Sequence, residues 1–501
     1  MDIAVLWSHV NIRTVLLGLV IFTVLSWFFR RPKKLPPGPW GWPLLGNIPQ
    51  LARISEPVHE ALSKMGDRYG PVFSFKVVNQ LVVVLQDYDV IKQAMDQYQL
   101  NGRPSFEISQ ITLPGHGILT ASGAPWVELR RFSSSALRKL GMGKSSLGKQ
   151  ISTEAQFLVE EIRKQGGKSF NPKDMLQNAV ANVICYLVFG SRFEYTDVRF
   201  KELLVALNYS HELGGAGGVV EFVPIFAKLT FLPIVKKHIA SNRAFEKIMG
   251  NLLKEHEKGY QPEISRDYTD AFYSEMKAKE SNGQPTFMNP VSLYYSVSGL
   301  FGAGTETTTS TLGWILLYMI GYPEIQTKVQ REIDSVVGRD RLPQLSDKPK
   351  LVFTQAVLSE IHRVSIVPLG VPHKCTEDTT VSGFHIPEGT IVITNLWHIL
   401  NDPREWTNPK EFRPERFLDS DGNFVRREKL IPFGIGRRFC LGENLAKMEL
   451  FIVFTVLMHQ FTFKAPEGAS VSFKAREALT LAPIPYEVVA IPRNSEHINN
   501  P

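Results

Sequence analysis

Residues 433–442 read FGIGRRFCLG and contain Cys440, one of three cysteines in the 501-residue chain. This cysteine lies in a loop just before a helix that is predicted to begin near Glu443. The backbone N–H groups of the loop and the helix dipole are therefore expected to lower the pKa of the thiol and to favour a thiolate. Gly436 permits a turn that other residues resist, and Gly442 lets the helix approach a flat ligand closely.

Two further side chains complete the loop. Arg438 offers a cation for a carboxylate, and Phe433 can shield the sulfur of Cys440. A thiolate with an arginine and glycines suits axial ligation of a haem iron. The alternative is a buried, inert cysteine beside a surface turn. Five fixed positions in so short a segment should recur by chance in roughly one chain in ten thousand of this length, which favours the ligand.

Composition excludes several classes of protein. The chain is 44% hydrophobic and 21% charged, close to ordinary globular usage, so it is neither disordered nor collagen-like. Its net charge of +7 is modest, and a short N-terminal cluster supplies much of it, which argues against a nucleic-acid partner. Cys185, Cys375 and Cys440 are too dispersed for a zinc site or a disulfide framework.

The N-terminal segment predicts a membrane anchor. Residues 14–29 read TVLLGLVIFTVLSWFF without a charge, and Arg30, Arg31, Lys33 and Lys34 follow. We expect a transmembrane signal-anchor over residues 1–30, with the basic cluster and the rest of the chain in the cytosol. A cleaved signal peptide and a buried core helix are the alternatives. Residues 31–47 form a basic, proline-rich hinge, and one large domain is expected over 48–501.

Helical patterns dominate that domain. The longest helix is predicted over about 290–320, with Asn289 as its cap and Gly321 and Pro323 at its end. Shorter helices are predicted from Pro323 to Val337, over about 351–364 and over about 443–459.

Strands are predicted at 71–77, 81–85 and 379–393, the last as a hairpin around Pro387-Glu388-Gly389. The fold class is therefore mainly α with a small β region (α+β).

The chain resembles a cytochrome P450 over essentially its whole length. The Phe-x-x-Gly-x-Arg-x-Cys-x-Gly loop of that family is intact at 433–442. The sequence is most similar to those of the microsomal animal enzymes that oxidise drugs, fatty acids and steroids. The resemblance implies a P450-like fold behind the N-terminal anchor. It also implies a single catalytic haem domain over 48–501, with haem b as cofactor and Cys440 as its proximal metal ligand.

A second family motif is Glu360-Ile-His-Arg363, which places a carboxylate and a guanidinium on one helix face. Arg416, in Phe412-Arg-Pro-Glu-Arg-Phe417, resembles the third member of the family's buried Glu-Arg-Arg network. The resemblance assigns these three residues to structure and not to catalysis. A solvated surface pair is the alternative for the first two.

A third motif, Ala303-Gly-Thr-Glu-Thr-Thr308, lies in the middle of the long helix. Small residues such as Ala303 leave room for a planar macrocycle. The hydroxyl of Thr307 can bond back to the carbonyl of residue 303 and open a groove for dioxygen and water. The resemblance gives Thr307 and Glu306 the role of delivering protons to dioxygen. A Ser/Thr-rich core helix is the alternative.

Basic residues are expected at the haem propionates. Trp126 and Arg130 match the family's Trp-x-x-x-Arg helix, and the resemblance adds Arg103, His373 and Arg438. An arginine fork suits a carboxylate, and two buried propionates need several donors. For Arg103 and His373 an ordinary surface or loop position is the alternative.

The family pattern also places the substrate pocket. It would be lined by the loop 104–120, by residues near 208–222, by Leu300–Ala303 and by Val364–Val371, which are mostly apolar. Residues 222–235 (FVPIFAKLTFLPIV) are predicted to form a lid that dips into the membrane, with a helix–helix connection packed inside as the alternative.

The implied function is the insertion of one oxygen atom from O₂ into an apolar fatty acid, steroid or xenobiotic. NADPH-derived electrons would come from NADPH–cytochrome P450 reductase, with cytochrome b5 as a further candidate donor, at the endoplasmic reticulum membrane. Arg437 and Lys447 are candidates for the basic docking face. Two alternatives stay open: a reductase-independent haem-thiolate isomerase or dehydratase, and a non-catalytic, membrane-anchored haem-binding protein.

Overall fold

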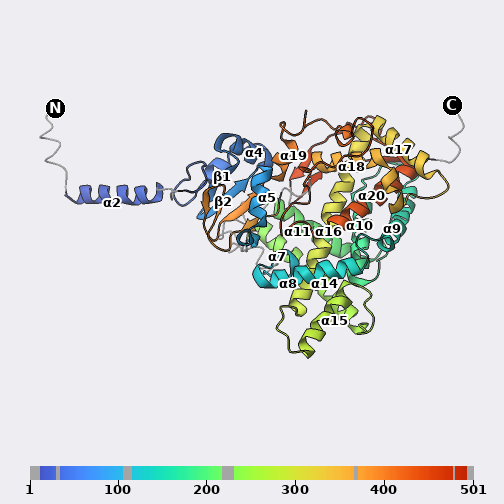
Figure 1. Cartoon of the computed structure of the whole chain (residues 1–501), viewed down its shortest axis with the longest axis horizontal. Coiled ribbons are helices and arrows are strands. Elements are labelled where there is room, and N and C mark those ends of the chain that lie inside the picture. Colours follow the sequence, from blue (N-terminus) through green and yellow to red (C-terminus); the bar gives the residue numbers. More distant parts are fainter. Residues whose placement is uncertain are drawn as a thin grey trace.

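The computed structural model describes residues 12–29, 34–104, 115–216, 231–365, 370–477 and 480–493. Helices form most of the molecule, and α16 runs through its middle (Figure 1). The α-helices are α2 (Ile12–Phe29), α3 (Ile48–Leu51), α4 (Val58–Tyr69), α5 (Tyr88–Asp96), α7 (Gly117–Thr120), α8 (Gly123–Lys139), α9 (Ser145–Arg163), α10 (Lys173–Phe189), α11 (Val198–Ala216), α14 (Pro233–Lys258), α15 (Tyr268–Ser281), α16 (Pro290–Gly321), α17 (Pro323–Val337), α18 (Val352–Val364), α19 (Leu396–Asn401) and α20 (Glu443–Gln460).

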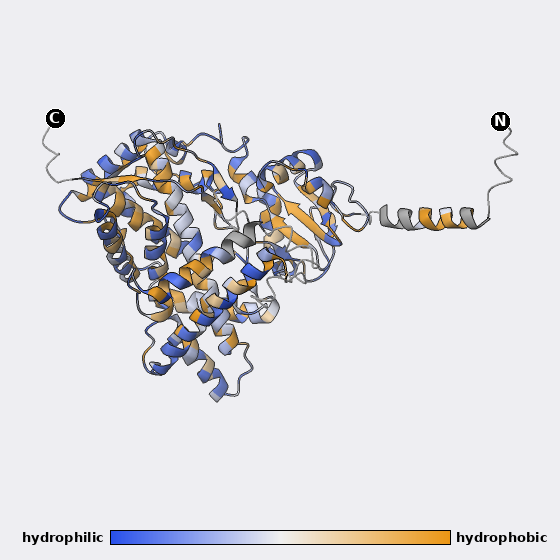
Figure 2. Cartoon of the chain, turned by 180° about the vertical axis from the view of Figure 1, so that it is seen from behind, coloured by the Kyte–Doolittle hydropathy of each residue, from blue (hydrophilic) through white to orange (hydrophobic). Residues whose placement is uncertain are grey.

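The strands are short. They are β1 (Val72–Val77), β2 (Gln80–Leu85), β3 (His373–Lys374), β4 (Thr379–Val381), β5 (Phe384–Ile386), β6 (Ile391–Thr394), β7 (Phe461–Lys464), β8 (Ala475–Glu477), β9 (Leu481–Pro483) and β10 (Val489–Pro492). Four of them form one sheet in the order β1-β2-β6-β3, in which β2 and β6 are parallel and the other pairs antiparallel. This sheet lies at the end of the body nearest α2, and its apolar strands stand out in Figure 2. The predicted mixture of many helices and a small sheet is confirmed.

The long central helix α16 forms as predicted. The side chain of Asn289 accepts a hydrogen bond from the backbone N–H of Ser292, and the hydroxyl of Ser292 accepts one from the N–H of Asn289, which is a reciprocal capping box. Pro290 occupies the first turn, where its missing N–H costs nothing. The helix ends at Gly321, ahead of Pro323.

The core surrounds α16. Helix α10 is apolar on nearly every side because it packs against α16 on one face and α9 on the other. Helix α20 packs against α9, α16 and α17. As a result, the loop that precedes α20 is held against the middle of the molecule, which is where the site lies.

The predicted hairpin around Pro387-Glu388-Gly389 is wrong. Strands β4 and β5 pair in an antiparallel register that leaves only Ser382 and Gly383 between them. Both residues have positive φ (49° and 79°), as a two-residue hairpin turn requires. The segment after Gly389 leaves this hairpin, because β6 pairs with β2 and β3 of the larger sheet.

The N-terminal helix α2 covers residues 12–29, and the apolar side chains from Val15 to Phe22 are exposed. Among the helices that the structure describes, none is both long and apolar enough to cross a membrane. The transmembrane anchor predicted over 1–30 is thus not confirmed and stays a prediction. The proline-rich segment is fastened to the sheet from Pro36 onward, because Ser74 donates hydrogen bonds to the carbonyls of Pro36 and Pro37.

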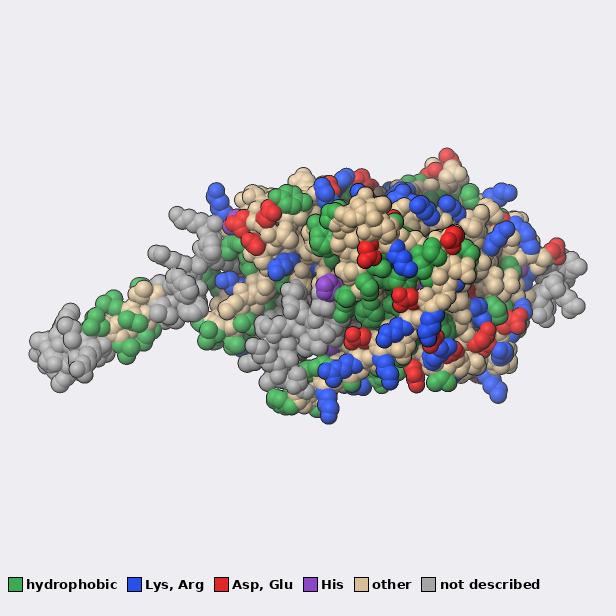
Figure 3. Space-filling view, turned by 90° about the horizontal axis from the view of Figure 1, so that it is seen from below, with side chains coloured by type: hydrophobic (Ala, Val, Ile, Leu, Met, Phe, Trp, Pro, Cys, Tyr) green, Lys and Arg blue, Asp and Glu red, His purple; other side chains and the backbone are tan. Residues whose placement is uncertain are grey.

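Parts of several predicted segments lie outside the described residues. These are Arg30, Arg31 and Lys33 of the basic cluster, residues 105–114 of the first pocket loop, residues 217–230 of the predicted lid and residues 366–369 after α18. On the face of the molecule shown in Figure 3, basic and acidic side chains are interspersed, which is consistent with the modest net charge.

Candidate active site

The loop around Cys440 is closed by its own backbone. The N–H of Cys440 donates to the carbonyl of Phe433 (2.9 Å), and the N–H of Phe439 donates to the carbonyl of Gly436 (3.1 Å). Gly436 has φ +79°, and a Cβ there would lie 2.5 Å from the Cβ and carbonyl oxygen of Met95. Gly436 is therefore required both by the turn and by the close approach of α5, as predicted for the turn. A Cβ on Gly442 would lie 4.0 Å from the sulfur of Cys440.

The prediction that the loop lowers the pKa of Cys440 is wrong for the protein alone. Burial raises the pKa of this thiol. The N–H groups of Gly442 and Glu443 and the charge of Arg130 act in the opposite direction but do not offset the burial. In the protein alone, burial therefore favours the neutral thiol of Cys440.

Cys440 faces a cavity of about 310 Å³. Of the residues that the sequence singles out, those lining this cavity are Arg103, Trp126, Arg130, Ala303, Thr307, His373, Phe433, Arg438, Cys440 and Gly442. Glu306, Gly436 and the Glu360 network do not line it. Cys185 and Cys375 are buried elsewhere, and burial raises the pKa of both thiols.

Three guanidinium groups converge on the cavity, and none forms an ion pair with a carboxylate within the described part of the chain. Arg438 donates to the carbonyl of Asn101 (2.9 Å), Arg103 to that of Pro372 (2.8 Å) and Arg130 to that of Phe439 (2.6 Å). Burial together with the neighbouring arginines lowers the pKa of Arg438 to about 8. Burial and Arg130 lower the pKa of Arg103 to about 10.

Trp126 lies beside these cations. The guanidinium of Arg438 stacks 4.0 Å from the centre of its ring, and the buried indole Nε1 has no hydrogen-bond partner among the described residues. A cluster of partly buried cations that pair with no carboxylate, beside an orphaned N–H donor, suits the binding of anionic oxygen atoms.

His373 opens strand β3, and its Nδ1 bonds the carbonyl of Leu100 (2.9 Å). Burial, followed by the charge of Arg103, lowers the pKa of His373 to about 3. The imidazole is therefore neutral, with Nδ1–H as the donor, and its Nε2 accepts hydrogen bonds. A carboxylate beside the ring would raise this pKa and favour the doubly protonated imidazole, in which Nε2–H also donates.

The motif on α16 is split between two faces of the helix. Thr307 faces the cavity, and its hydroxyl donates to the carbonyl of Ala303 (2.8 Å), as predicted. The carboxylate of Glu306 is buried on another face of the helix. There it lies 3.5 Å from the hydroxyl of Ser310 and 3.4 Å from that of Thr480.

Glu360, Arg363 and Arg416 form one buried network. Arg363 binds both oxygens of Glu360 (2.7 Å each), and Nε of Arg416 binds Oε1 (3.1 Å). Glu360 and Arg363 are fully buried, which excludes the alternative of a solvated pair. The two arginines also donate to the carbonyls of Leu400, Thr407, Asn408, Pro409 and Glu411, so the network ties α18 to the segment 400–416.

Comparison with known proteins agrees with this geometry. The family profile described as "Cytochrome P450" matches residues 36–490. The chain belongs to the cytochrome P450 family. It is 41% identical to "Cytochrome P450 2J5" of Mus musculus (97% of each chain), 40% identical to "Cytochrome P450 2J2" of Homo sapiens (98% of each) and 38% identical to "Cytochrome P450 2U1" of Bos taurus (95% of this chain and 93% of that one). As a P450 monooxygenase it is an oxidoreductase, and the family implies a haem iron, dioxygen and reducing electrons.

The residues that line the cavity fit a haem independently of the family match. Cys440 is the one cysteine of the described residues that lines the cavity, and a cysteine sulfur is an axial ligand suited to a haem iron. The unpaired Arg103, Arg130 and Arg438 suit two buried carboxylates, for which Trp126 offers a further donor. Apolar residues make up most of the remaining wall.

Sequence reasoning missed two ionisable residues of the cavity wall, His362 and Glu449. His362 lies edge-on to Phe433 (5.2 Å between ring centres), and burial lowers its pKa to about 4. Glu449 is a single carboxyl in the apolar run 448–458 of α20. A lone acid in so apolar a helix was the sequence feature that could have indicated Glu449 as a residue of the site.

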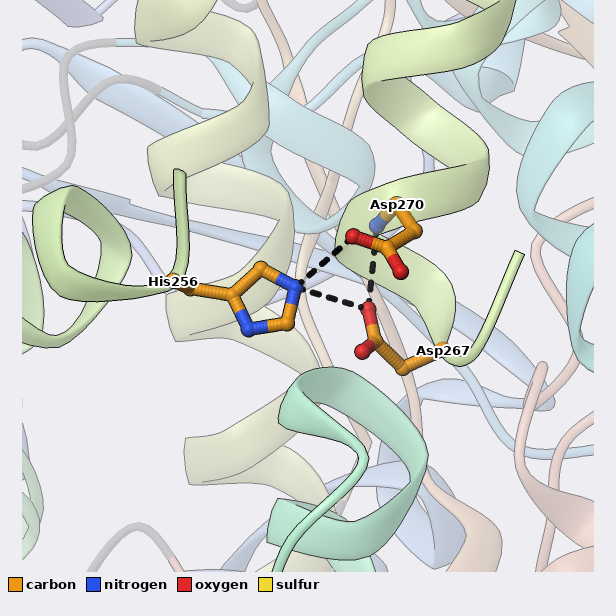
Figure 4. A group of neighbouring side chains, drawn as sticks. All are labelled: His256, Asp267 and Asp270. Atoms are coloured by element: carbon orange, nitrogen blue, oxygen red, sulfur yellow. Dashed lines mark hydrogen bonds and ion pairs between the residues drawn. The ribbon is translucent and has the colours of Figure 1, made fainter. Parts of the chain in front are cut away.

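Within the described residues, one further cluster has metal-ligand residue types. His256 at the end of α14 lies 3.2 Å from Asp267 and 3.0 Å from Asp270 at the start of α15 (Figure 4). Arg266 binds both oxygens of Asp270, and Asp267 caps α15. These partners make the cluster a structural joint between two helices, and none of its residues lines the cavity.

Proposed function

We propose that this P450 holds haem b through Cys440 and inserts one oxygen atom of O₂ into an apolar small molecule. The overall reaction is RH + O₂ + NADPH + H⁺ → ROH + H₂O + NADP⁺. The observation that carries the proposal is that Cys440, Thr307 and the unpaired arginines all line one mainly apolar cavity.

When bound, haem supplies the iron chemistry that activates dioxygen. The chain's own residues do the rest. Arg103, Arg130 and Arg438 would hold the propionates, with a further hydrogen bond from Trp126, and Cys440 would be the ligand of the iron. The hydroxyl of Thr307, which faces the same cavity, would order water there and pass protons. Glu306 remains a candidate for the same role, but its carboxylate points away from the cavity.

An apolar substrate is supported by the cavity lining. Ile118, Leu119, Leu300 and Ala303 face the cavity on the α16 side, and among the described residues only Glu449 presents a carboxyl group there. Such a wall binds fatty acids, steroids or xenobiotics by burial of apolar surface and discriminates weakly between them.

Electrons would come from NADPH–cytochrome P450 reductase, with cytochrome b5 as a further donor. Arg437 is exposed in the Cys440 loop, and the side chain of Lys447, which pairs with Glu443 (2.5 Å), is 41% exposed nearby. A basic surface there would attract an acidic partner by charge. We place the enzyme at the endoplasmic reticulum membrane, attached by residues 1–30 and with residues 48–501 as a cytosolic haem domain.

The test is a spectrum followed by product analysis. Reduced protein with carbon monoxide should give the red-shifted absorbance of a thiolate-ligated haem, and Cys440→His should abolish that band. With reductase, NADPH and a panel of fatty acids, sterols and drugs, the parent should form hydroxylated product. An unchanged spectrum in Cys440→His would refute the ligand, and product formation without NADPH would favour an isomerase or dehydratase.

A further inference from the structure

Lys447 and Glu443 lie one turn apart at the start of α20, the helix that follows the Cys440 loop. The ammonium of Lys447 lies 2.5 Å from Oε1 of Glu443 and 5.3 Å from the centre of the Phe433 ring. Both contacts attract an ammonium group, because one is an ion pair between i and i+4 and the other is a cation–π contact. A single cation thus joins a carboxylate of α20 to an aromatic ring of the Cys440 loop.

Phe433 connects this cation to the residue that would bind the iron. Its carbonyl accepts the hydrogen bond from the N–H of Cys440 (2.9 Å), and both residues line the cavity. The ring also meets His362, another residue of the cavity wall, edge-on with 5.2 Å between the ring centres. The Lys447 ammonium therefore reaches the Cys440 loop through a single side chain, and its ion pair with Glu443 holds it there.

The charges of this pair act on groups in the cavity wall. Burial lowers the pKa of His362 to about 4, and the charges of Lys447 and then Lys348 add to this effect. Burial raises the pKa of the Cys440 thiol, and the charge of Glu443 acts in the same direction. The cation thus disfavours a second positive charge in the wall, whereas the carboxylate disfavours negative charge on the sulfur.

We propose that the Lys447–Glu443 pair tunes the reduction potential of the haem iron bound by Cys440: Lys447 favours the reduced iron, and Glu443 opposes it. This inference deepens the proposed monooxygenase function and rests on it, because it requires haem at Cys440. Reduction adds one electron to the iron, which NADPH supplies in turnover through the reductase, and the protein makes or breaks no bond. A positive charge near the ligand stabilises the state with the extra electron, and a negative charge destabilises it. Lys447 is a positioning residue, because it acts through Phe433 and Cys440.

The first variant is Lys447→Met, which keeps a long apolar side chain beside Phe433 but removes the charge. The full-length holoprotein is titrated with dithionite and redox mediators, without reductase, and the haem absorbance is followed. At a fixed potential we expect the ratio of reduced to oxidised haem to fall about fivefold, the upper range for charges that are partly exposed to solvent. This change equals about 40 mV, at about 59 mV per tenfold for one electron.

Two further variants separate the effect of charge from a loss of structure. Glu443→Gln should raise the same ratio by a similar factor, because it leaves the charge of Lys447 unopposed. The double variant, Lys447→Met with Glu443→Gln, should lie close to the parent, because it removes both charges. Lys447→Arg keeps a cation that can pair with Glu443 and stack on Phe433, so it should retain the parental potential. A general loosening of the fold would not shift the two single variants in opposite directions.

The matched control is Lys328→Met. The ammonium of Lys328 lies 3.8 Å from the centre of the Phe353 ring and 3.0 Å from a carboxylate oxygen of Glu415, so it makes the same two kinds of contact as Lys447. Neither Lys328 nor Phe353 lines the cavity. This variant loses the same unit of charge, and we expect it to keep the parental potential.

The second readout is the infrared spectrum of the carbon monoxide complex. A cation near the sulfur withdraws electron density from the iron, and a carboxylate has the opposite effect. The C–O stretching frequency should therefore fall in Lys447→Met, rise in Glu443→Gln and stay at the parental value in Lys328→Met.

Three results would overturn the inference. The first is a parental potential in both Lys447→Met and Glu443→Gln, and the second is a shift of the same sign in both. The third is an equal shift in Lys328→Met, which would show an effect of net charge and not of this pair. If Lys447→Met loses turnover with reductase but keeps the parental potential, Lys447 serves partner docking and not the iron. A parent without the carbon monoxide band of a thiolate-ligated haem would instead refute the proposed function, so the two failures are distinguishable.

Discussion

The substitution Glu360→Gln tests how the buried network supports the fold. Glu360 accepts two hydrogen bonds from Arg363, one from Arg416 and one from the backbone N–H of Arg413. Glutamine has the same shape but carries no charge, and its amide nitrogen would face the donors of Arg363. The fully buried Arg363 is then left without a counter-ion.

Breaking a buried pair in this way costs about 3–5 kcal/mol. The backbone carbonyls of Leu400, Pro409 and Glu411 still accept from Arg363, so we expect the lower end, about 3 kcal/mol. That is a large part of the roughly 5–15 kcal/mol by which a protein is stable, and it corresponds to a factor of about 150 in the unfolding equilibrium.

The assay is urea unfolding, followed by circular dichroism and by haem absorbance. The matched control is Glu415→Gln, because Glu415 pairs with Lys328 (3.0 Å) while both side chains are about half exposed. Such a surface pair contributes about 0–1 kcal/mol. If Glu360→Gln unfolds at the same urea concentration as the parent and as Glu415→Gln, the network does not carry the stability that its geometry implies.

Three further outcomes are expected. Thr307→Ala should still bind substrate, as measured by the spectral shift. It should lower the product formed per NADPH by about 10- to 100-fold, which corresponds to about 1.4–2.7 kcal/mol. If the variant forms as much product per NADPH as the parent, Thr307 is an ordinary core residue. Arg438→Gln should weaken haem binding in a titration by roughly 10- to 150-fold, the value of a charged hydrogen bond, and unchanged affinity would remove Arg438 from the propionate site. Burial lowers the pKa of His256, but the hydrogen bonds and charges of Asp267 and Asp270 outweigh it and raise the pKa above 6.5. The stabilisation of the folded state by protonated His256 is complete below pH 6.5 and is lost as the pH rises through the folded pKa. The unfolding free energy of the parent should therefore fall over that pH range, and that of His256→Gln should stay flat there.

The sequence by itself determined the local structure around the site. Asn289 and Pro290 at the start of α16, and Gly321 before Pro323 at its end, are short-range signals that act within one turn, and the helix has these bounds. The bond from Thr307 to the carbonyl of Ala303 is equally local. The loop at 433–442 could be read in the same way, because its turn depends on glycine at 436.

The tertiary structure alone decided which groups share the cavity. The hairpin turn at 382–383 was not predicted because β6 pairs with β2, a strand some 300 residues earlier in the chain, and not with the strands next to it in sequence. The raised pKa of Cys440 depends on burial by distant elements, which no motif encodes.

Glu306 and Glu449 show the same limit at the site itself. Adjacent residues on a helix point about 100° apart, so the neighbour of Thr307 can face away from the cavity, while an acid on α20 faces into it. Which carboxyl meets the cavity is set by how two helices pack, and that information lies in the core and not in either motif.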